Sequence, residues 1–391
     1  MVQNCVFLSH QHDSSPDVLR LSHELQFRGV VPWVDKLPGG FRAGDDSVDE
    51  ACRVIREDSS AFALYLTEKA LYSDFIRDFE IPVAVERRRQ DPSYPIVVIS
   101  PEYEFGQIKI LVKDHFGIDL TFAHGFAKAS DEGIEDFILT VARELLHKYM
   151  RALTIPQNTF ELSVSSFESI ASSPSELLRV DATHALACRI DTMHIWSRLL
   201  NGLEDVKREI SNGFGRPRLV INGSKHFTAA FITGRVFNRF TIDISQKAEY
   251  WTTDGTIEKL SDFSIDYRPG SHTKKALLVE IATGEKNIKA GVDALVSTGI
   301  VEDGGRLQVR PIKGRVNVTD VISRSLAHCT YSAIDKAANS KATAEVHVFV
   351  AAPQAFFMTL GTLFQGMPEV HLYEWVDGAY IESMVVPSLV R

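Results

Sequence analysis

The feature that most constrains the fold is an alternation, over the first 150 residues, of short apolar runs with amphipathic stretches. Apolar runs at 5–8, 61–66 and 95–99 have the length of buried strands, and the segments between them show helical periodicity. Strands separated by a crossover helix cannot pair as a hairpin, so the pattern predicts a parallel sheet covered on both faces. With a fifth strand at 117–122 and a closing helix at 131–153, the order is β-α-β-α-β-α-β-β-α. A flavodoxin-like five-stranded α/β domain fits that order.

The pattern of apolar and polar residues changes after this region. A polar, proline-containing segment at 154–160 predicts a linker between a first domain, 1–153, and a second, 161–391. The second contains two β-loop-α-β units, at 218–244 and at 346–375.

The two units share a pattern that indicates internal duplication. Gly234-Arg-Val-Phe237 in the first and Gly361-Thr-Leu-Phe364 in the second occupy matching places. The repeat predicts two pseudo-symmetric α/β halves, 161–270 and 271–391.

Composition limits the class of protein. With 45% hydrophobic and 24% charged residues the chain can bury a core, and no apolar run approaches the length of a membrane helix. Residues 1–150 hold 25 acidic and 16 basic side chains, so the whole net charge of −9 lies there, which argues against a DNA or RNA polymer as partner. The N-terminus lacks a signal-peptide profile, so a cytoplasmic location is expected.

Cofactor and metal motifs are missing from the sequence pattern. Neither G-x-x-x-x-G-K-[ST] nor G-x-G-x-x-G occurs, which removes the main support for an ATPase or a Rossmann dehydrogenase. The four cysteines are far apart, and His10 and His12 on a loop are weak evidence for ligation, so no metal site is predicted.

One carboxylate stands out near the expected ligand edge. In a flavodoxin-like sheet ligands collect at the carboxyl ends of strands one and three, here the segments 9–13 and 67–80. Glu80 lies in an otherwise apolar helical stretch, so it is either partly buried and directed at the cleft or ion-paired with Arg77 or Arg87. The pattern alone leaves both readings open.

Residues 3–150 resemble the TIR domain family. Val6-Phe-Leu-Ser-His10 is similar to its opening strand, the segment from Trp33 to Gly44 to its second strand and mobile loop, and Glu80-Ile-Pro-Val-Ala84 to its third signature. The aromatic Phe75 departs by one place from the Trp usual in the family, and Trp33 fits core packing as well as stacking on a base.

The resemblance implies an NAD⁺ glycohydrolase that releases nicotinamide and ADP-ribose. It implies Glu80 as the catalytic residue, because a carboxylate can stabilise an oxocarbenium-like ribose once nicotinamide leaves. The implied substrate-binding residues are Ser9, His10, Trp33, Asp35 and Phe75, and the implied oligomer-loop residues are Lys36, Phe41 and Arg42.

Residues 160–391 resemble the SAVED sensor domain, which is built like two fused CARF-type halves that bind cyclic oligonucleotides. The resemblance rests on 226–240, 250–254, 277–284 and 353–375. Helix N-termini at 224–226 and 353–354 would offer free N–H groups to phosphates, although ordinary capping explains each residue alone equally well. The implied cyclic-nucleotide ligands are Ser224, Lys225, His226, Trp251, Thr253, Thr283 and Gln354.

Together the two resemblances imply an antiphage effector of the CBASS type. Its substrate would be NAD⁺, with no cofactor, and its activator a cyclic oligoadenylate, with cyclic triadenylate as the family-level expectation. Activator binding would drive head-to-tail homo-oligomerisation into a filament that completes the TIR sites. A non-catalytic TIR adaptor and a TIR enzyme that makes a cyclic ADP-ribose signal remain as alternatives.

Overall fold

A computed structural model describes most of the chain as two compact units. The first comprises residues 1–154 and 171–180, and the second residues 155–170 and 181–391. Among the described residues, no helix has the length and apolar character needed to cross a membrane. The described residues are 5–35, 47–117, 119, 124–155, 158–167, 177–187, 192–246, 249–270, 275–284, 288–314, 316–341 and 343–387.

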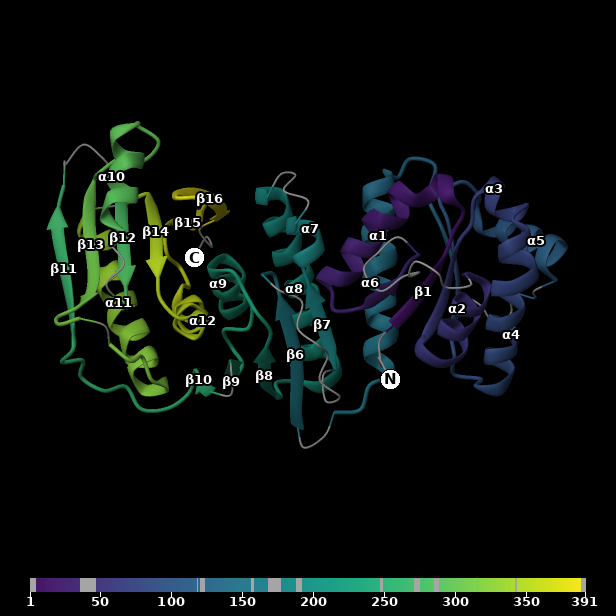
Figure 1. Ribbon diagram of the computed structural model, residues 1–391, viewed down its shortest axis with the longest axis horizontal. Coiled ribbons are helices and arrows are strands. Elements are labelled where there is room, and N and C mark those ends of the chain that lie inside the picture. The colour runs from purple at the N-terminus through teal and green to yellow at the C-terminus, as the bar shows by residue number, and fades with distance from the viewer. Residues whose placement is uncertain are drawn as a thin grey trace. The chain divides into compact units, whose positions relative to one another are not determined.

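The first unit contains a five-stranded sheet of order β2-β1-β3-β4-β5, in which every neighbouring pair is parallel. This confirms the predicted parallel α/β architecture. Helices α1 and α6 pack together on one face of the sheet (Figure 1). The strands are β1 (Cys5–Ser9), β2 (Val31–Trp33), β3 (Ala61–Tyr65), β4 (Ile96–Ser100) and β5 (His124–Ala127). The helices are η1 (His12–Ser14), α1 (Ser15–Phe27), α2 (Ser47–Arg53), the π-helical η2 (Val54–Asp58), α3 (Glu68–Leu71), the π-helical η3 (Ile76–Glu80), α4 (Ile81–Gln90), α5 (Phe105–Phe116) and α6 (Ile134–Ala152).

The fifth strand was predicted in the wrong place. A helix, α5, precedes it, opened by a capping box between Glu104 and Gln107 and ended by Gly117, whose φ of +68° is left-handed. Gly117 is therefore a helix terminator rather than the start of a strand. The strand itself, β5, begins at His124, beyond residues 118 and 120–123, which lie outside the description.

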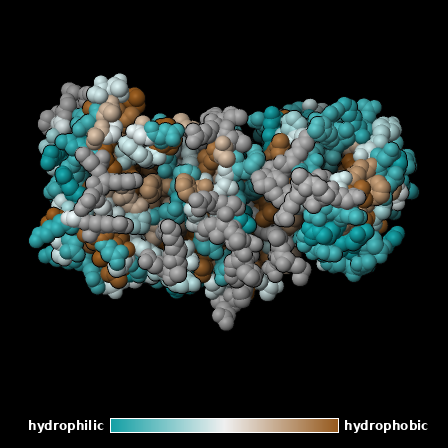
Figure 2. Space-filling model, viewed as in Figure 1, coloured by the Kyte–Doolittle hydropathy of each residue, from teal (hydrophilic) through white to brown (hydrophobic). Residues whose placement is uncertain are grey.

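The surface of the first unit is mainly hydrophilic on the face shown in Figure 2. Among the described residues of this unit, the exposed large apolar side chains are Tyr72, Phe79, Phe105 and Ile110. Isolated apolar side chains of this kind are normal on a folded domain and need no bound partner to explain them.

The second unit is organised around two sheets. One has the order β10-β9-β8-β6-β7, in which residues 178–180 of β7 are counted with the first unit, and the other has the order β11-β13-β12-β14-β15-β16. The strands are β6 (Thr159–Ser165), β7 (Leu178–Asp181), β8 (Arg218–Asn222), β9 (Ile242–Gln246), β10 (Glu249–Thr252), β11 (Phe263–Pro269), β12 (Ala276–Ala282), β13 (Gly305–Pro311), β14 (Glu345–Ala351), β15 (Glu369–Val376) and β16 (Ala379–Val386). The helices are α7 (Thr183–Ala187), α8 (Thr192–Phe214), α9 (Phe227–Val236), α10 (Lys289–Ser297), α11 (Asp320–Lys341) and α12 (Gln354–Leu363).

The two sheets repeat one topology. In the first, β8 is followed by α9 and by the parallel strand β9, and an antiparallel strand, β10, completes the unit. In the second, β14, α12, β15 and β16 follow the same order with the same pairings.

Two boundaries differ from those expected from the sequence. Strand β6 begins at Thr159, inside the segment expected as a linker. Strand β11 precedes the expected boundary at 270 yet pairs antiparallel with β13 of the second sheet, which also pairs in parallel with β12.

The helices α9 and α12 cross at two glycines. A Cβ added to Gly234 would lie 1.9 Å from the backbone oxygen of Met358, and one added to Gly361 would lie 2.1 Å from the backbone oxygen of Phe231. Each helix thus lacks a side chain where the other helix's backbone passes. The matching glycines of the sequence repeat are therefore the contact between the duplicated helices.

This crossing gives a stability prediction. Gly234→Ala should lower the free energy of unfolding by about 1–3 kcal/mol, because the new methyl group meets backbone and not a movable side chain. Gly213→Ala on α8 is the matched control, since nothing lies within 4 Å of its added Cβ and alanine favours a helix. Urea denaturation of both variants measures the effect. Equal midpoints would contradict the close approach.

Candidate active site and ligand cavity

The carboxyl group of Glu80 lies at the carboxyl end of the first sheet. Ser9 is the last residue of β1, and its hydroxyl donates a hydrogen bond of 2.6 Å to Glu80 Oε2. Glu80 itself ends the π-helical turn η3, directly before α4. A π-helical turn inserts a residue into the helical register and occurs often at functional sites. The sheet order places β1 beside both β2 and β3, so this is the predicted position where the winding reverses.

Burial sets the protonation state of Glu80. The residue is only 7% exposed, and this desolvation raises the pKa of its carboxyl from 4.5 to about 7. The hydrogen bond from Ser9 opposes the rise, and the charge of Asp35 adds to it. The reading of Glu80 as a solvent-facing, ion-paired side chain is wrong: Arg77 pairs with Asp74 and Asp78.

The other residues predicted around Glu80 fall into two groups. His10 and Asp35 approach each other, with 3.8 Å between His10 Nε2 and Asp35 Oδ1, so Ser9, His10, Asp35 and Glu80 gather at one edge of the sheet. Trp33, by contrast, stacks on the buried ring of Phe7 with 4.7 Å between centroids. This contact agrees with the alternative in which Trp33 packs in the core.

Phe75 packs half-buried against the core one turn before Glu80. The three oligomer-loop residues Lys36, Phe41 and Arg42 lie outside the described residues.

The second unit contains a cavity of about 530 Å³ beside the N-terminus of α9. That volume is in the range of pockets that hold small ligands. Its wall combines aromatic rings with hydroxyl and carboxylate groups from loops, helices and the β15–β16 hairpin. The lining residues are Ser166, Phe167, Thr183, Leu186, Ala187, Trp196, His226, Glu374, Val376, Asp377, Ile381, Glu382 and Ser383.

His226 is the predicted ligand residue that lines this cavity. It is the N-cap of α9, and its ring lies edge-on to Phe167 and Trp196 with centroid distances of 5.3 and 5.7 Å. Burial lowers the pKa of the imidazole, so it is neutral at pH 7. Phe167 is 62% exposed at the same wall. The cavity therefore offers aromatic faces on which a base can stack.

The expectation of free N–H groups at the start of α9 is wrong for two of them. The backbone N–H of His226 donates to Ser166 Oγ at 2.8 Å, and that of Thr228 donates to Glu374 Oε1 at 2.7 Å. Glu374 is buried, and desolvation raises the pKa of its carboxyl to about 7 against the lowering effect of these hydrogen bonds. A side chain from the second sheet thus takes the position where a phosphate was expected.

Lys225 is buried, and the backbone of Ser224 is already hydrogen-bonded. Lys225 Nζ donates to the carbonyl oxygens of Asn222 and Gly223 at 2.6 and 2.9 Å, and full burial lowers the pKa of its amine to about 7. The backbone oxygen of Ser224 accepts from Ser166 N at 2.9 Å. Gln354, at the start of α12, donates its side-chain amide to the backbone oxygen of Lys225. The two predicted helix starts are therefore joined to each other.

Trp251, Thr253 and Thr283 are not among the residues that line the cavity. Trp251 is buried on β10, Thr253 Oγ1 accepts from Ile242 N at 3.1 Å, and the backbone N–H of Thr283 donates to Ala351 O at 3.0 Å.

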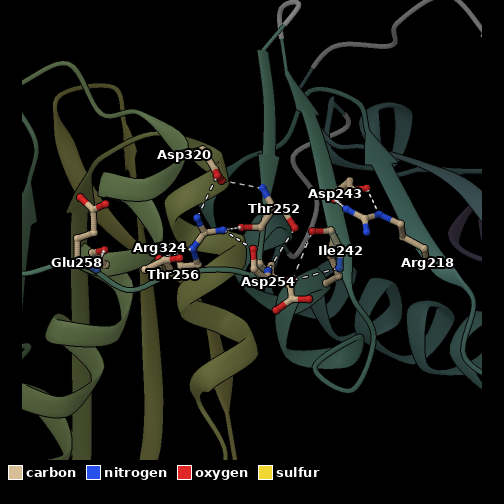
Figure 3. A network of polar contacts seen from close by, with 11 residues as sticks. Arg218, Ile242, Asp243, Thr252, Asp254, Thr256, Glu258, Asp320 and Arg324 are labelled. Atoms are coloured by element: carbon tan, nitrogen blue, oxygen red, sulfur yellow. Dashed lines mark hydrogen bonds and ion pairs between the residues drawn. The ribbon is translucent and has the colours of Figure 1, made fainter.

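A network around Arg324 fixes the segment after β10 (Figure 3). From α11, Arg324 donates to the backbone oxygens of Thr252, Asp254 and Thr256 and pairs with Asp320. Asp320 in turn accepts from Thr252 N at 2.8 Å. Trp251 and Thr253 thus flank a structural junction.

The sequence analysis missed most of the cavity wall. Ser166, Phe167 and Asp377 lie in loops, where no periodic pattern marks them. An available signal was the aromatic Phe167, which follows two residues after the end of the apolar strand β6.

Comparison with known proteins identifies the second unit. Residues 203–386 match the SAVED family, described as "SMODS-associated and fused to various effectors sensor domain". Residues 203–386, within the second unit, are therefore similar to SAVED domains. The chain is similar to the CD-NTase-associated protein 4 of an Acinetobacter species (strain ATCC 27244 / 9458) and of Moraxella osloensis. Each match is 23% identical and covers 48% of this chain and 40% of the relative, so the chain matches less than half the length of these relatives.

Solved structures agree on the fold. The Acinetobacter baumannii Cap4 SAVED/CARF-domain containing receptor with the cyclic trinucleotide 3'3'3'-cAAA superimposes with a TM-score of 0.51 at 16% identity, over 83% of this chain and 87% of that one. The same receptor with 2'3'3'-cAAA gives a TM-score of 0.52 at 15% identity, over 84% and 88%. The predicted SAVED/CARF-like architecture is confirmed at the level of the fold.

Proposed function

We propose that this protein is a cyclic-oligonucleotide-activated NAD⁺ hydrolase of CBASS antiphage defence. The observation that carries the enzymatic part is the buried carboxyl of Glu80, hydrogen-bonded to Ser9 at the carboxyl edge of a parallel sheet. The similarity to SAVED domains supports the sensory part. The resemblance of residues 3–150 to TIR enzymes connects the two.

One carboxylate suffices for the proposed reaction. Nicotinamide is a good leaving group, so the barrier falls mainly when a negative charge stabilises the oxocarbenium-like ribose that forms as the N-glycosidic bond breaks. Glu80 supplies that charge in its ionised form, and Ser9 holds the carboxylate in place. Water then attacks the ribose and yields ADP-ribose.

The proposed activator is a cyclic trinucleotide of adenosine, and its proposed site is the cavity at α9. Cyclic trinucleotides are the ligands that the two similar receptor structures contain. The rings of Phe167, His226 and Trp196 give the cavity stacking surfaces. Asp377, Glu382 and Glu374 make part of its wall acidic, so a ligand would be bound there through bases and hydroxyls more than through phosphates.

The proposed NAD⁺ hydrolysis has to be regulated, because it harms the cell that contains the enzyme. An enzyme that consumed NAD⁺ constantly would kill its own cell, so the activator must bind the active assembly more tightly than the resting protein. We propose that binding drives head-to-tail association into a filament that completes each active site with a neighbouring TIR domain.

The proposal is tested with the purified chain, NAD⁺ and a panel of cyclic di-, tri- and tetranucleotides. We expect nicotinamide release and increased light scattering together, with cyclic triadenylate and no other ring size. Scattering that stays flat while NAD⁺ falls would remove the assembly step. Assembly without nicotinamide release would favour the adaptor function, and chromatography of the product separates ADP-ribose from its cyclic form.

The hydrogen bond from Ser9 predicts a pH effect. Because it lowers the pKa of Glu80, Ser9→Ala should raise that pKa above about 7, by roughly one unit for a charge-assisted bond, and move the rising limb of the kcat/KM profile to higher pH. Ser100→Ala is the matched control, because Ser100 is also buried at a strand end but donates to Leu66 O. An unshifted Ser9→Ala profile would show that Glu80 ionisation does not control the rate.

A further inference from the structure

A cluster of histidines and carboxylates lies at the start of two neighbouring strands of the second unit. Strand β14 begins Glu345-Val-His347 and β15 begins Glu369-Val-His371. The two strands are parallel, and their register pairs Glu345 with Glu369 and His347 with His371. Alternate residues of a strand face the same side of a sheet, so all four side chains lie on one face. This end of the strands is opposite the end that contributes Glu374 to the cavity.

The potential ligand atoms converge. His347 Nε2 lies 3.4 Å from Glu345 Oε2, and His371 Nε2 lies 3.2 Å from Glu369 Oε1. The two imidazole rings are stacked with 4.4 Å between centroids. One ligand atom from each of Glu345, His347 and His371 falls within 4.8 Å of the others. Ligand atoms of tetrahedral zinc are about 3.3 Å apart, so small side-chain movements would complete the geometry.

The remaining ring nitrogens already have partners of the kind that support metal-bound histidines. His371 Nδ1 is hydrogen-bonded to Glu382 on β16, and His347 Nδ1 lies 3.0 Å from the hydroxyl of Tyr373. A histidine that binds metal through one nitrogen commonly donates its other N–H to a carboxylate or another acceptor, which fixes the ring. Both Nε2 atoms are thereby oriented toward the carboxylates of Glu345 and Glu369.

Charge and exposure also fit a cation. Glu345 and Glu369 face each other directly across two strands, where like charges destabilise pairing. With Glu382, three carboxylates surround the two rings, and a divalent cation between them would reverse the repulsion. The imidazoles are buried, whereas the carboxylates of Glu345 and Glu369 are about half exposed, which leaves a path from solvent.

We propose that Glu345, His347 and His371, with Glu369 as a fourth ligand, form a binding site for a divalent transition metal, of which zinc best fits the mixed nitrogen and oxygen donors. A metal ion bound there would link the first residues of β14 to the first residues of β15. The site is separate from the proposed NAD⁺ chemistry, and none of its four proposed ligands lines the activator cavity.

The test is equilibrium dialysis of the full, chelator-treated chain against buffered micromolar Zn²⁺, with bound zinc measured per chain. We expect one equivalent for the natural protein and loss of binding in His371→Gln and in Glu345→Gln. Glu382→Gln, which removes the carboxylate partner of His371 Nδ1 and leaves the four proposed ligands in place, should weaken binding by about 10- to 100-fold. His194→Gln, an exposed histidine on α8, is the matched control and should bind as the natural protein does.

Thermal unfolding supplies a second readout. Zinc should raise the melting temperature of the natural protein in proportion to the logarithm of its free concentration, and should leave the melting temperature of His371→Gln unchanged. The proposal would be overturned if the natural protein bound clearly less than one zinc ion per chain. It would also be overturned if folded His371→Gln still bound one zinc ion per chain.

Discussion

Glu80→Gln should abolish nicotinamide release while leaving activator binding and assembly intact. Removing a preorganised electrostatic contact to a transition state costs about 100- to 1,000-fold in rate, and here the amide replaces the only charge proposed to face the ribose. The measurement is NAD⁺ turnover at saturating activator, with light scattering recorded in parallel. Glu86→Gln, an exposed glutamate on α4, is the control and should retain full activity.

The same variant should be more stable than the natural protein. The pKa of Glu80 rises on folding from 4.5 to about 7, so the unfolded chain releases its proton first and stability falls as pH rises through that interval. Above pH 7 the loss of folding free energy caused by ionisation of the buried Glu80 approaches its limit of about 3 kcal/mol, and below pH 4.5 this loss disappears. Glu80→Gln should therefore unfold at higher urea than the natural protein at pH 8 and at equal urea near pH 4. Equal stability of Glu80→Gln and the natural protein at pH 8 would contradict the burial and the raised pKa of the Glu80 carboxyl.

Removing two aromatic rings from the cavity should weaken binding of the proposed activator. Loss of base stacking costs about 1–3 kcal/mol per base, so Phe167→Ala and His226→Ala together should raise the half-activating concentration of cyclic triadenylate by about 30-fold or more. Both rings line the cavity, and Phe167 is largely exposed, so its removal leaves the core unchanged.

Two features make that experiment decisive. Turnover at saturating activator should return to the natural rate, because neither ring belongs to the first unit. Tyr250→Ala is the matched control, since Tyr250 is a 75% exposed aromatic of the same unit that does not line the cavity. A Phe167→Ala, His226→Ala double variant with unchanged half-activation would move the activator site elsewhere.

Local patterns predicted the parts of the fold that they control directly. The crossover alternation implied the parallel order of the first sheet, whereas the apolar surroundings of Glu80 allowed either burial or an ion pair, and the structure shows burial. The helix α5 was missed because its start depends on a capping box between Glu104 and Gln107, and its end on Gly117, which also fits the beginning of a strand.

Long-range contacts could not be predicted. Glu374 reaches the start of α9 from 146 residues away and accepts the backbone N–H of Thr228, whereas the N–H of His226 donates to Ser166. Lys225 looked like a phosphate ligand but is held by the carbonyl oxygens of its own turn. The histidine cluster depends on a strand register, although the repeated Glu-Val-His triplet at both strand starts was a visible signal.

The crossing of α9 and α12 limits how the sensor can move. At Gly234 and Gly361 the backbones touch with no side chain between them, so neither helix can slide without colliding with its partner's carbonyl groups. The two halves thus meet at a fixed contact, and a signal from the proposed activator cavity would have to pass as a rotation about that contact or through the loops and hairpin around it. Enlarging either glycine would therefore disturb transmission even in a protein that still folds and still binds its messenger.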